Sequence, residues 1–174
     1  MRRLLLLRHA KATVMTGRED HERALIERGR RDAARIAAFV GASGLTPELV
    51  IHSGARRARE TAEIARAAWP RVVEARAEPR LYEASRPAIE AIVRALPDGC
   101  ASVMVVGHNP SLADAAHHLI GRGADSDLLR IAAKFPTGGL AALEFDVAHW
   151  RNVEPSSAAL ACFATPDDPK VEKA

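Results

Sequence analysis

Short apolar runs alternate along this chain with longer amphipathic stretches, and this alternation restricts the fold more than any other feature of the sequence. The apolar runs have the length and composition of buried strands, whereas the stretches between them have the spacing of helices with one polar face. Strands that alternate with helices form βαβ units, and these units build a mainly parallel sheet with helices on both faces. The sequence therefore predicts an α/β fold, a three-layer α/β/α sandwich.

Six strands and four helices are expected from this pattern. The strands are predicted at 3–7, 48–52, 72–75, 102–107, 139–145 and 159–163, and the helices at about 22–42, 55–68, 86–95 and 111–120. No helix separates the last two strands, so they are expected to form a closing pair that is antiparallel at one edge of the sheet. The connections are short, and no cap domain is expected over the sheet.

The chain of 174 residues fits a single domain, expected over 1–164 and followed by a polar, proline-containing tail at 165–174 that is expected to fray. Its two cysteines, Cys100 and Cys162, are far apart in the sequence. The four leucines near the start are too few for a signal peptide or a membrane span. A cytoplasmic protein with free thiols is therefore expected.

Charge patterning narrows the classes of partner. The formal net charge is +3 at pH 7, and acidic residues are mixed among the arginines, as in "RALIERGRRDAARIAAF", so that no stripe of one sign forms. Nucleic-acid binders show a concentrated basic face or base-stacking aromatics, and aromatic residues are only 4% of this chain. Neither nucleic acid nor a membrane is expected as a partner, and the oligomeric state is left open.

Basic and imidazole side chains follow three of the predicted strands. Arg8 and His9 follow the first strand, "SGARRARET" follows the second, and "GHNP" follows the fourth. Each segment alone is ordinary: a surface pair, the polar start of a helix with Ser53 as its N-cap, and a turn. In open α/β sheets, however, ligands gather beyond the carboxyl ends of the strands, so the three segments are expected to converge.

A pocket that contains two imidazoles, at least two guanidiniums and helix N-termini suits a phosphoryl group. Nearby arginines lower the pKa of a histidine, which makes the neutral imidazole available near pH 7. Neutral imidazole can attack phosphorus to form a covalent phosphohistidine, which water then hydrolyses. The surrounding donors would stabilise the phosphoryl oxygens in the transition state.

Other phosphate and metal chemistries lack their motifs. The chain has no P-loop sequence, and neither cysteine is followed six positions later by the arginine of a cysteine-phosphatase loop. No apolar strand leads into Asp125–Leu128, which is expected to be a solvated loop. His117 and His118 are adjacent on a predicted helix and point about 100° apart, which does not suit a zinc site. No metal and no cofactor is expected.

The three strand-end segments, "LLLLRHAKA", "IHSGARRARETAEIA" and "VMVVGHNPSL", resemble the histidine phosphatase superfamily, also called phosphoglycerate-mutase-like. The sequence "RHAKA" in place of Arg-His-Gly, and the short length without an inserted cap, resemble its SixA-type phosphohistidine phosphatase branch. The similarity extends over about residues 3–163 and includes "DHERALIERG", "LYEA" and "PTGGLAALEFD". It implies a metal-independent phosphatase that acts through a transient phosphohistidine.

The resemblance implies a role for each residue that matches a family motif. His9 is similar to the nucleophile, Arg8 to the neighbouring phosphate-binding arginine, and His108 to the second histidine, which contacts phosphate in its charged form. The family pattern Ser-Pro-x-x-Arg-Ala-x-x-Thr aligns its phosphate-binding arginine with Arg57, while Gly54 stands where proline is usual.

Further candidates surround this set. Glu83 in "RLYEAS" matches the acidic proton donor that many superfamily members carry after the third strand, although phosphohistidine has a good leaving group and depends less on a strong acid. Asp20 and Arg23 match a recurrent Asp-x-x-Arg element, and Arg23, Lys11 and Asn109 are candidates for the pocket rim. Ordinary surface or helix-orienting roles are the alternatives for Glu83, Arg23 and Lys11.

The expected substrate is a protein that carries phosphohistidine, because the short connections leave the site open. A small phosphomonoester is the alternative substrate. A mutase reaction is disfavoured, since it must exclude water and usually requires lid segments. A non-catalytic phosphate-binding module would use the same pocket, but the intact set of arginines and histidines argues against it.

Overall fold

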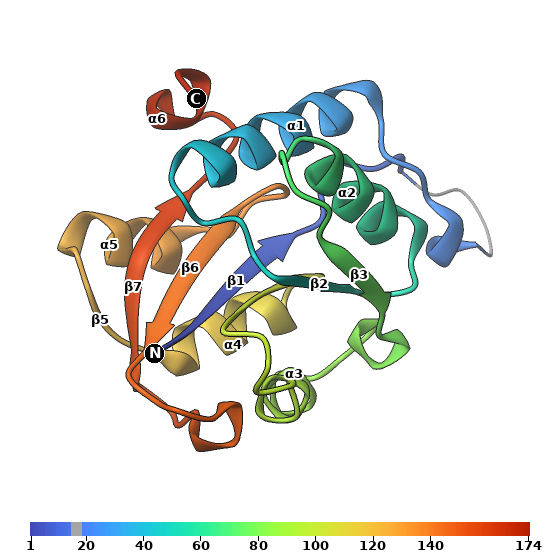
Figure 1. The fold of residues 1–174 in the computed structure, drawn as a ribbon. Helices are drawn as coiled ribbons and strands as arrows, with labels where there is room; N and C mark the ends of the chain where they lie inside the picture. Colours follow the sequence, from blue (N-terminus) through green and yellow to red (C-terminus); the bar gives the residue numbers. More distant parts are fainter. Residues whose placement is uncertain (15–18) are drawn as a thin grey trace.

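The computed structural model describes residues 1–14 and 19–174, and in these residues seven strands form one sheet in the order β3-β2-β4-β1-β6-β7-β5 (Figure 1). The strands are β1 (Arg2–Arg8), β2 (Leu49–His52), β3 (Glu74–Ala77), β4 (Ser102–Gly107), β5 (Ile120–Gly123), β6 (Leu140–Phe145) and β7 (Ala158–Ala164). Only β6 is reversed, since it pairs antiparallel with both β1 and β7 while the other pairs are parallel. The predicted mainly parallel sheet with a closing antiparallel pair is confirmed, and the reversed strand lies inside the sheet, with β7 and β5 beyond it.

Helices cover both faces of this sheet, as the sequence predicted. The helices are α1 (Glu27–Ala42), α2 (Arg56–Ala67), α3 (Arg86–Arg94), α4 (Ser111–Leu119), α5 (Asp125–Ala133) and α6 (Pro169–Glu172). Buried side chains of α1, α2 and α6 share one core cluster, and those of α3, α4 and α5 share another. Figure 1 shows α1 and α2 above the sheet and α3 and α4 below it. The fold is therefore an α/β/α sandwich.

The four leucines of β1 explain why this strand is at the centre. Leu4 and Leu6 belong to the core cluster under α3 and α4, whereas Leu5 and Leu7 belong to the cluster under α1 and α2. None of the four is more than 2% exposed. Burial of a leucine side chain contributes about 1.5–3 kcal/mol, so this run strongly favours a strand that is covered on both faces. It places Arg8, and His9 after it, at the carboxyl edge of the sheet.

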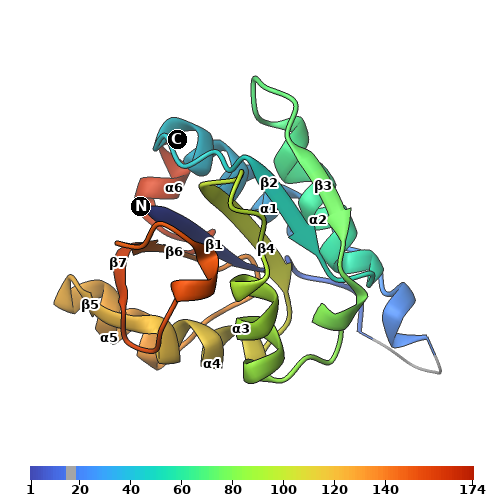
Figure 2. The same cartoon turned by 60° about the horizontal axis from the view of Figure 1, so that its bottom comes forward.

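Two predicted boundaries differ from the structure for local reasons. The predicted strand at 72–75 is β3 at Glu74–Ala77, an edge strand in Figure 2, because Val72 is almost fully exposed and only Val73 turns inward. The predicted helix at 22–42 begins at Glu27, and Asp20–Glu22 form a separate 3₁₀ turn before it. This turn brings Asp20 to the carboxyl edge of the sheet.

The C-terminal third holds elements that the hydrophobic pattern did not predict. Asp125–Leu128 is not a loop but the first turn of α5, and Asp127 accepts a hydrogen bond from the backbone N–H of Phe163 at 2.9 Å. The edge strand β5 precedes it. Within the segment for which a frayed end was expected, α6 forms and Val171 is buried. No helix in residues 1–14 and 19–174 is long and apolar enough to cross a membrane.

Candidate active site

The carboxyl ends of β2, β4 and β1 lie side by side, because these three strands are parallel neighbours in the sheet. Arg8, the last residue of β1, pairs with Gly107, the last residue of β4. The next residue of each strand is a histidine, and the ring centroids of His9 and His108 are 5.0 Å apart. The structure thus brings together the segments that the sequence expected to converge.

His9 is buried, with 8% of its surface exposed, and its ring has a defined proton position. Nδ1 lies 2.8 Å from the carbonyl oxygen of Ala10, which only accepts hydrogen bonds, so Nδ1 carries the proton. Nε2 therefore has a free lone pair, which accepts a hydrogen bond from Nε of Arg57 at 3.3 Å. Burial first, and then the charges of Arg57 and Arg8, lower the pKa of His9 to about 4. The direction agrees with the sequence-based expectation, although burial is a larger cause than the arginines.

The backbone on both sides of His9 is fastened to neighbouring elements. The N–H of His9 donates to the carbonyl oxygen of Gly107, and the N–H of Ala10 donates to the hydroxyl of Thr61 at 3.1 Å. The Thr61 hydroxyl in turn donates to the carbonyl oxygen of Arg57 at 2.7 Å. Thr61 is the last residue of the matched arginine motif, and this role in joining α2 to the His9 segment was not predicted.

Arg57 lies in the first turn of α2 and is 6% exposed. Its Nη1 donates to the carbonyl oxygen of Asp20 at 2.7 Å, and its Nη2 donates to the carboxylate of the same residue at 2.9 Å. The neighbouring arginines point elsewhere: Arg56 pairs with Glu60 of the same helix, and Arg59 faces solvent. The structure places against His9 the one arginine of the motif that the resemblance selected.

His108 is held by a serine. Ser53 is fully buried, and its hydroxyl oxygen lies 2.6 Å from Nε2 of His108. The prediction that Ser53 caps α2 is wrong, because the N-cap lies two residues later at Ala55 and the helix begins at Arg56. Burial first, and then the neighbouring His9 and Arg57, lower the pKa of His108 to about 3. Without a ligand His108 is therefore neutral, whereas the charged form was expected for His108 in contact with phosphate.

Three buried polar atoms of this site have no hydrogen-bond partner. Among the described residues the only buried side-chain atoms of this kind are Arg8 Nε, His108 Nδ1, Asn109 Oδ1 and one serine hydroxyl on β4. Arg8 Nη1 and Asn109 Nδ2 both donate to the carbonyl oxygen of Phe135, each at 2.9 Å, which fixes the two side chains. Buried polar groups are normally satisfied in native proteins. Such a group of unsatisfied atoms is suited to bind a polar ligand.

A pocket of about 270 Å³ opens beside these groups, lined by Asp20, Arg57, Tyr82, Glu83, Ala84 and His108–Ser111. The Tyr82 hydroxyl donates to the Asp20 carboxylate at 2.8 Å, which raises the pKa of Tyr82. The tyrosine ring stands edge-on to the His108 ring, 5.7 Å between centroids. Sequence reasoning missed Tyr82, although its position directly before Glu83 in "LYEA" was a signal that could have identified it.

The remaining candidates have different positions. Glu83 is exposed, lines the pocket and has a φ of 53°, a left-handed conformation that is uncommon for a residue with a side chain. Arg23 does not line the pocket but donates from Nη1 to the Asp20 carboxylate at 2.9 Å. Lys11 is exposed and lines a separate hollow of about 200 Å³ together with Lys134. The structure therefore brings Glu83 to the pocket, links Arg23 to it through Asp20 and separates Lys11 from it.

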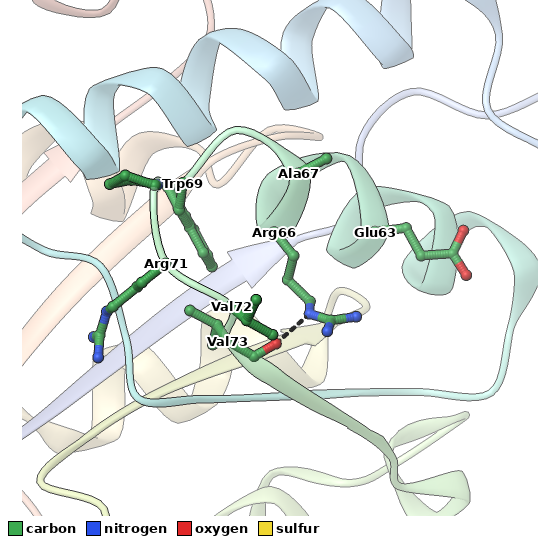
Figure 3. Close-up of a pocket in the computed structure, with 8 residues that line it drawn as sticks. Glu63, Arg66, Ala67, Trp69, Arg71, Val72 and Val73 are labelled. Carbon is green, nitrogen blue, oxygen red and sulfur yellow. Dashed lines mark hydrogen bonds between the residues drawn. The ribbon is translucent and has the colours of Figure 1, made fainter.

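A larger hollow of about 420 Å³ lies between the end of α2 and the start of β3 (Figure 3). Its charged lining consists of Glu63, Arg66 and Arg71, and the Arg66 side chain donates to the backbone carbonyl of Val73. Figure 3 shows Glu63 directed away from Arg66. This hollow has no imidazole, so the smaller pocket at the strand ends is the candidate active site.

In the part of the chain that the structure describes, no group of three or more histidine, cysteine, aspartate or glutamate side chains is arranged to hold a metal ion.

Comparison with known proteins relates this arrangement to one family. The family model described as the histidine phosphatase superfamily (branch 1) matches residues 4–90, which include His9 and Arg57. An uncharacterised protein of Mycobacterium tuberculosis is 35% identical over 162 residues, and the alignment covers 92% of this chain and 99% of the relative.

Solved structures share the fold over nearly the whole chain. A provisionally assigned phosphohistidine phosphatase, SixA, from Agrobacterium tumefaciens is 30% identical with a TM-score of 0.80, covering 95% of this chain and 98% of that one. The protein histidine phosphatase SixA complexed with tungstate has the same fold, with a TM-score of 0.76 at 20% identity over 94% of this chain and 97% of that one. The family match over half of the chain and the relative that aligns along almost all of it lead to one conclusion. This protein belongs to the histidine phosphatase superfamily, branch 1.

Proposed function

We propose that this protein is a phosphatase that hydrolyses phosphohistidine in a protein through a transient phosphohistidine on His9. One observation carries the proposal. Nε2 of His9, which carries no proton, lies beside Arg57 and His108 of the pocket lining. Arg8 Nε is a donor without a hydrogen-bond partner, and so is His108 Nδ1 when the Ser53 hydroxyl donates to Nε2 of the same ring. A neutral imidazole beside unsatisfied donors suits attack on a phosphoryl group, because the nucleophile is ready and the donors await anionic oxygens.

In the first step, His9 Nε2 attacks phosphorus and the bond between phosphorus and the substrate imidazole breaks. The leaving imidazole takes a proton from Glu83, which lines the pocket. In the second step, a water molecule attacks the phosphorus of phospho-His9 and gives a proton to the Glu83 carboxylate, and Nε2 becomes free as inorganic phosphate forms. Arg8, Arg57 and His108 hold the phosphoryl oxygens in both steps, which offsets the charge that develops in the transition state.

The likeness to SixA supports phosphohistidine as the substrate. A small phosphomonoester is the second candidate, and the position of Glu83 favours it. The alkoxide of an alkyl phosphate is a poor leaving group that needs a proton donor, whereas the imidazole of phosphohistidine depends less on one. A carboxylate on the pocket wall would serve the phosphomonoester more.

Substrate preference can be measured directly. The purified chain is incubated with a phosphohistidine peptide and with a panel of sugar and aryl phosphates, each with and without a chelator. We expect phosphate release to be fastest from the peptide and unchanged by the chelator. A faster rate on a monoester would favour the second candidate, loss of activity with chelator would contradict a metal-independent reaction, and no turnover of any substrate would refute the phosphatase.

The low pKa of His9 predicts the pH dependence of kcat/KM. The imidazole attacks only when neutral, so activity is lost as the pH falls through the pKa of about 4 in the folded protein. A histidine of ordinary pKa would already lose roughly tenfold by about pH 5.5. We expect no such loss when kcat/KM is measured on an acid-stable aryl phosphate and corrected for the ionisation of the substrate near pH 6. An enzyme-derived decline centred near pH 6.5 would contradict a neutral, desolvated His9.

Gly29 predicts a structural effect on the same site. A Cβ at Gly29 on α1 would lie 2.0 Å from the carbonyl oxygen of Lys11, two residues after His9. Gly29→Ala is therefore expected to lower the free energy of unfolding by about 1–3 kcal/mol, measured by chemical denaturation. It is also expected to lower kcat per folded molecule, because the segment that contains Lys11 and His9 has to move away from the new methyl group. Gly121→Ala is the matched control, because its Cβ would lie 1.9 Å from the carbonyl oxygen of Ser156 at the opposite edge of the sheet. The control should lose stability but keep its kcat, and equal losses of kcat in both variants would contradict the expected displacement of His9.

A further inference from the structure

The guanidinium of Arg57 is already occupied in the unliganded site. Its Nε donates to His9 Nε2, and its Nη1 and Nη2 donate to the backbone carbonyl and the carboxylate of Asp20. The contact to the carboxylate is 2.9 Å long. Hydrogen bonds from Arg23, Tyr82 and Arg57 hold the pKa of Asp20 well below its usual range, with Arg23 as the largest cause, so the group is an anion. An internal carboxylate thus stands where a phosphoryl oxygen would bind Arg57.

A phosphoryl group and this carboxylate compete for the same donors. Phosphoryl oxygens on Nη2 of Arg57 would be placed next to the Asp20 carboxylate, and like charges at such a distance repel. Asp20 is able to yield, because 45% of its side chain is exposed and it belongs to a short 3₁₀ turn. The two anions therefore exchange at Arg57 and do not share it.

We propose that Asp20 is a specificity-determining residue: it occupies the phosphoryl-binding face of Arg57, yields to phosphoryl groups and keeps weaker anions out. The inference rests on the proposed function and deepens it for the same site. The same competition acts on the product, since the returning carboxylate displaces inorganic phosphate from Arg57.

The selectivity follows from what Asp20 does not reach. The hydrogen-bond partners of its side chain are Arg23, Arg57 and Tyr82, whereas Arg8 Nε and His108 Nδ1 remain without a partner. A phosphoryl group gains these two donors in addition to Arg57. A carboxylate ligand would make with Arg57 only the contact that the Asp20 carboxylate already makes. Asp20 also has the advantage of being part of the chain, which gives it a high effective concentration at Arg57. Only the ligand with more oxygens and more charge is then able to displace it.

Arg23 retains Asp20 after the exchange. Its Nη1 holds the second carboxylate oxygen, Oδ1, at 2.9 Å, and the Tyr82 hydroxyl holds Oδ2 at 2.8 Å. Neither contact involves Arg57, so both persist when the carboxylate leaves the guanidinium. The Asp-x-x-Arg spacing brings the two side chains together across a single 3₁₀ turn. Arg23 is thus a positioning residue that acts on the phosphoryl site through Asp20.

Direct binding of inorganic phosphate and of acetate, measured by calorimetry, tests this inference. Asp20→Asn is expected to lower the Kd of phosphate about tenfold, equivalent to roughly 1.4 kcal/mol, and to lower the Kd of acetate by at least as much. Asp20→Ala, which removes the group altogether, should shift both constants in the same direction. Unchanged or weaker phosphate binding by folded Asp20 variants would overturn the inference.

The matched control is Glu22→Gln. Glu22 is an exposed acidic residue of the same 3₁₀ turn, its carboxylate pairs with His21, and it does not line the pocket. The substitution removes one carboxylate from the same turn, and an exposed charge acts only through a weak general electrostatic effect, so the phosphate Kd is expected to change less than about twofold. Equal effects of Glu22→Gln and Asp20→Asn would show that Asp20 acts only through its charge, against the inference.

A double-mutant cycle tests the role of Arg23. Arg23→Gln is expected to weaken phosphate binding, because Asp20 then has Arg57 as its remaining arginine partner and leaves it less readily. In the Asp20→Asn background the same substitution is expected to have little effect. An undiminished loss in that background would show that Arg23 attracts phosphate directly and would overturn its role through Asp20.

Binding of inorganic phosphate requires no turnover, so the two proposals can fail separately. Tighter phosphate binding by Asp20→Asn without hydrolysis of any substrate would refute the phosphatase and leave the competition intact. Hydrolysis with unchanged phosphate binding would have the opposite meaning. A fall in kcat at unchanged phosphate Kd would assign Asp20 to proton transfer instead of anion competition, and would also overturn the inference.

Discussion

His9→Ala is expected to lower kcat about 10⁴-fold or more, because the substitution removes the only group proposed to form a covalent bond with phosphorus. Nε2 of His9 is the nitrogen without a proton, and burial keeps the ring neutral at physiological pH. His108, the imidazole next to it, has its Nε2 directed to Ser53, and its Nδ1 is one of the groups proposed to hold the phosphoryl group. The variant should still fold, since the backbone N–H groups of residue 9 and Ala10 keep their partners, the Gly107 carbonyl and the Thr61 hydroxyl.

The measurement is single-turnover hydrolysis of a phosphohistidine peptide, combined with mass spectrometry of the quenched protein. The unmodified chain should gain the mass of one phosphoryl group on the peptide that contains His9, and His9→Ala should gain none. His117→Ala is a suitable control, because this exposed histidine on α4 hydrogen-bonds to the carbonyl oxygen of Ile131 and does not line the candidate pocket. Turnover by His9→Ala at the rate of the control would rule out a covalent intermediate on His9.

Arg57→Lys is expected to lower kcat about 10²–10³-fold, the typical effect of removing a preorganised donor from a site where negative charge develops. The planar guanidinium of Arg57 is held by α2 and offers Nε and Nη2 on the same side as His9 and Asp20. A lysine ammonium is a point charge on a flexible stem, so it keeps the charge but not the paired donors. It also leaves Asp20 without its buried partner, and this carboxylate would then repel the phosphoryl group.

The control for this prediction is Arg59→Ala, two residues further along the same helix. Arg59 is half-exposed and lies 3.8 Å from its nearest carboxylate, that of Glu63, which is a weak surface pair. Its removal should leave kcat unchanged and alter the melting temperature little. If Arg57→Lys retained full kcat while Arg59→Ala lost activity, the assignment of the phosphoryl-binding arginine within "SGARRARET" would be wrong.

Local patterns in the sequence were sufficient to predict the framework of this fold. Burial on both faces leaves a strong signal in a short segment, which is why 102–107 was predicted with the bounds of β4 and why the run of leucines identified β1. Parallel order then follows from the alternation with helices, because a right-handed crossover returns each strand in the same direction. The convergence of His9 and His108 could be predicted from this alone, since both residues follow parallel strands.

Where burial is partial, the same patterns were not sufficient. β5 has four residues and none of them is fully buried, and α5 has Ile131 as its only fully buried residue. Such elements depend on tertiary contacts, such as the hydrogen bond from Phe163 to Asp127. The start of β3 was misplaced for a related reason. A valine such as Val72 favours a strand by its propensity alone, and its exposure is known only once its surroundings are known.

The sequence by itself determined the central strands of the sheet, the edge where their carboxyl ends meet and the kinds of group that stand there, because these depend on burial and periodicity within short segments. Only the tertiary structure decided the partners of those groups: Ser53 turns to His108 instead of capping a helix, Tyr82 and Arg23 hold Asp20, and Asp20 occupies Arg57. Hydrogen-bond partners depend on the position of single atoms brought together from distant parts of the chain, and no local pattern records them. For that reason the chemistry of the site is visible in the sequence, whereas the competition at Arg57 is visible only in the folded protein.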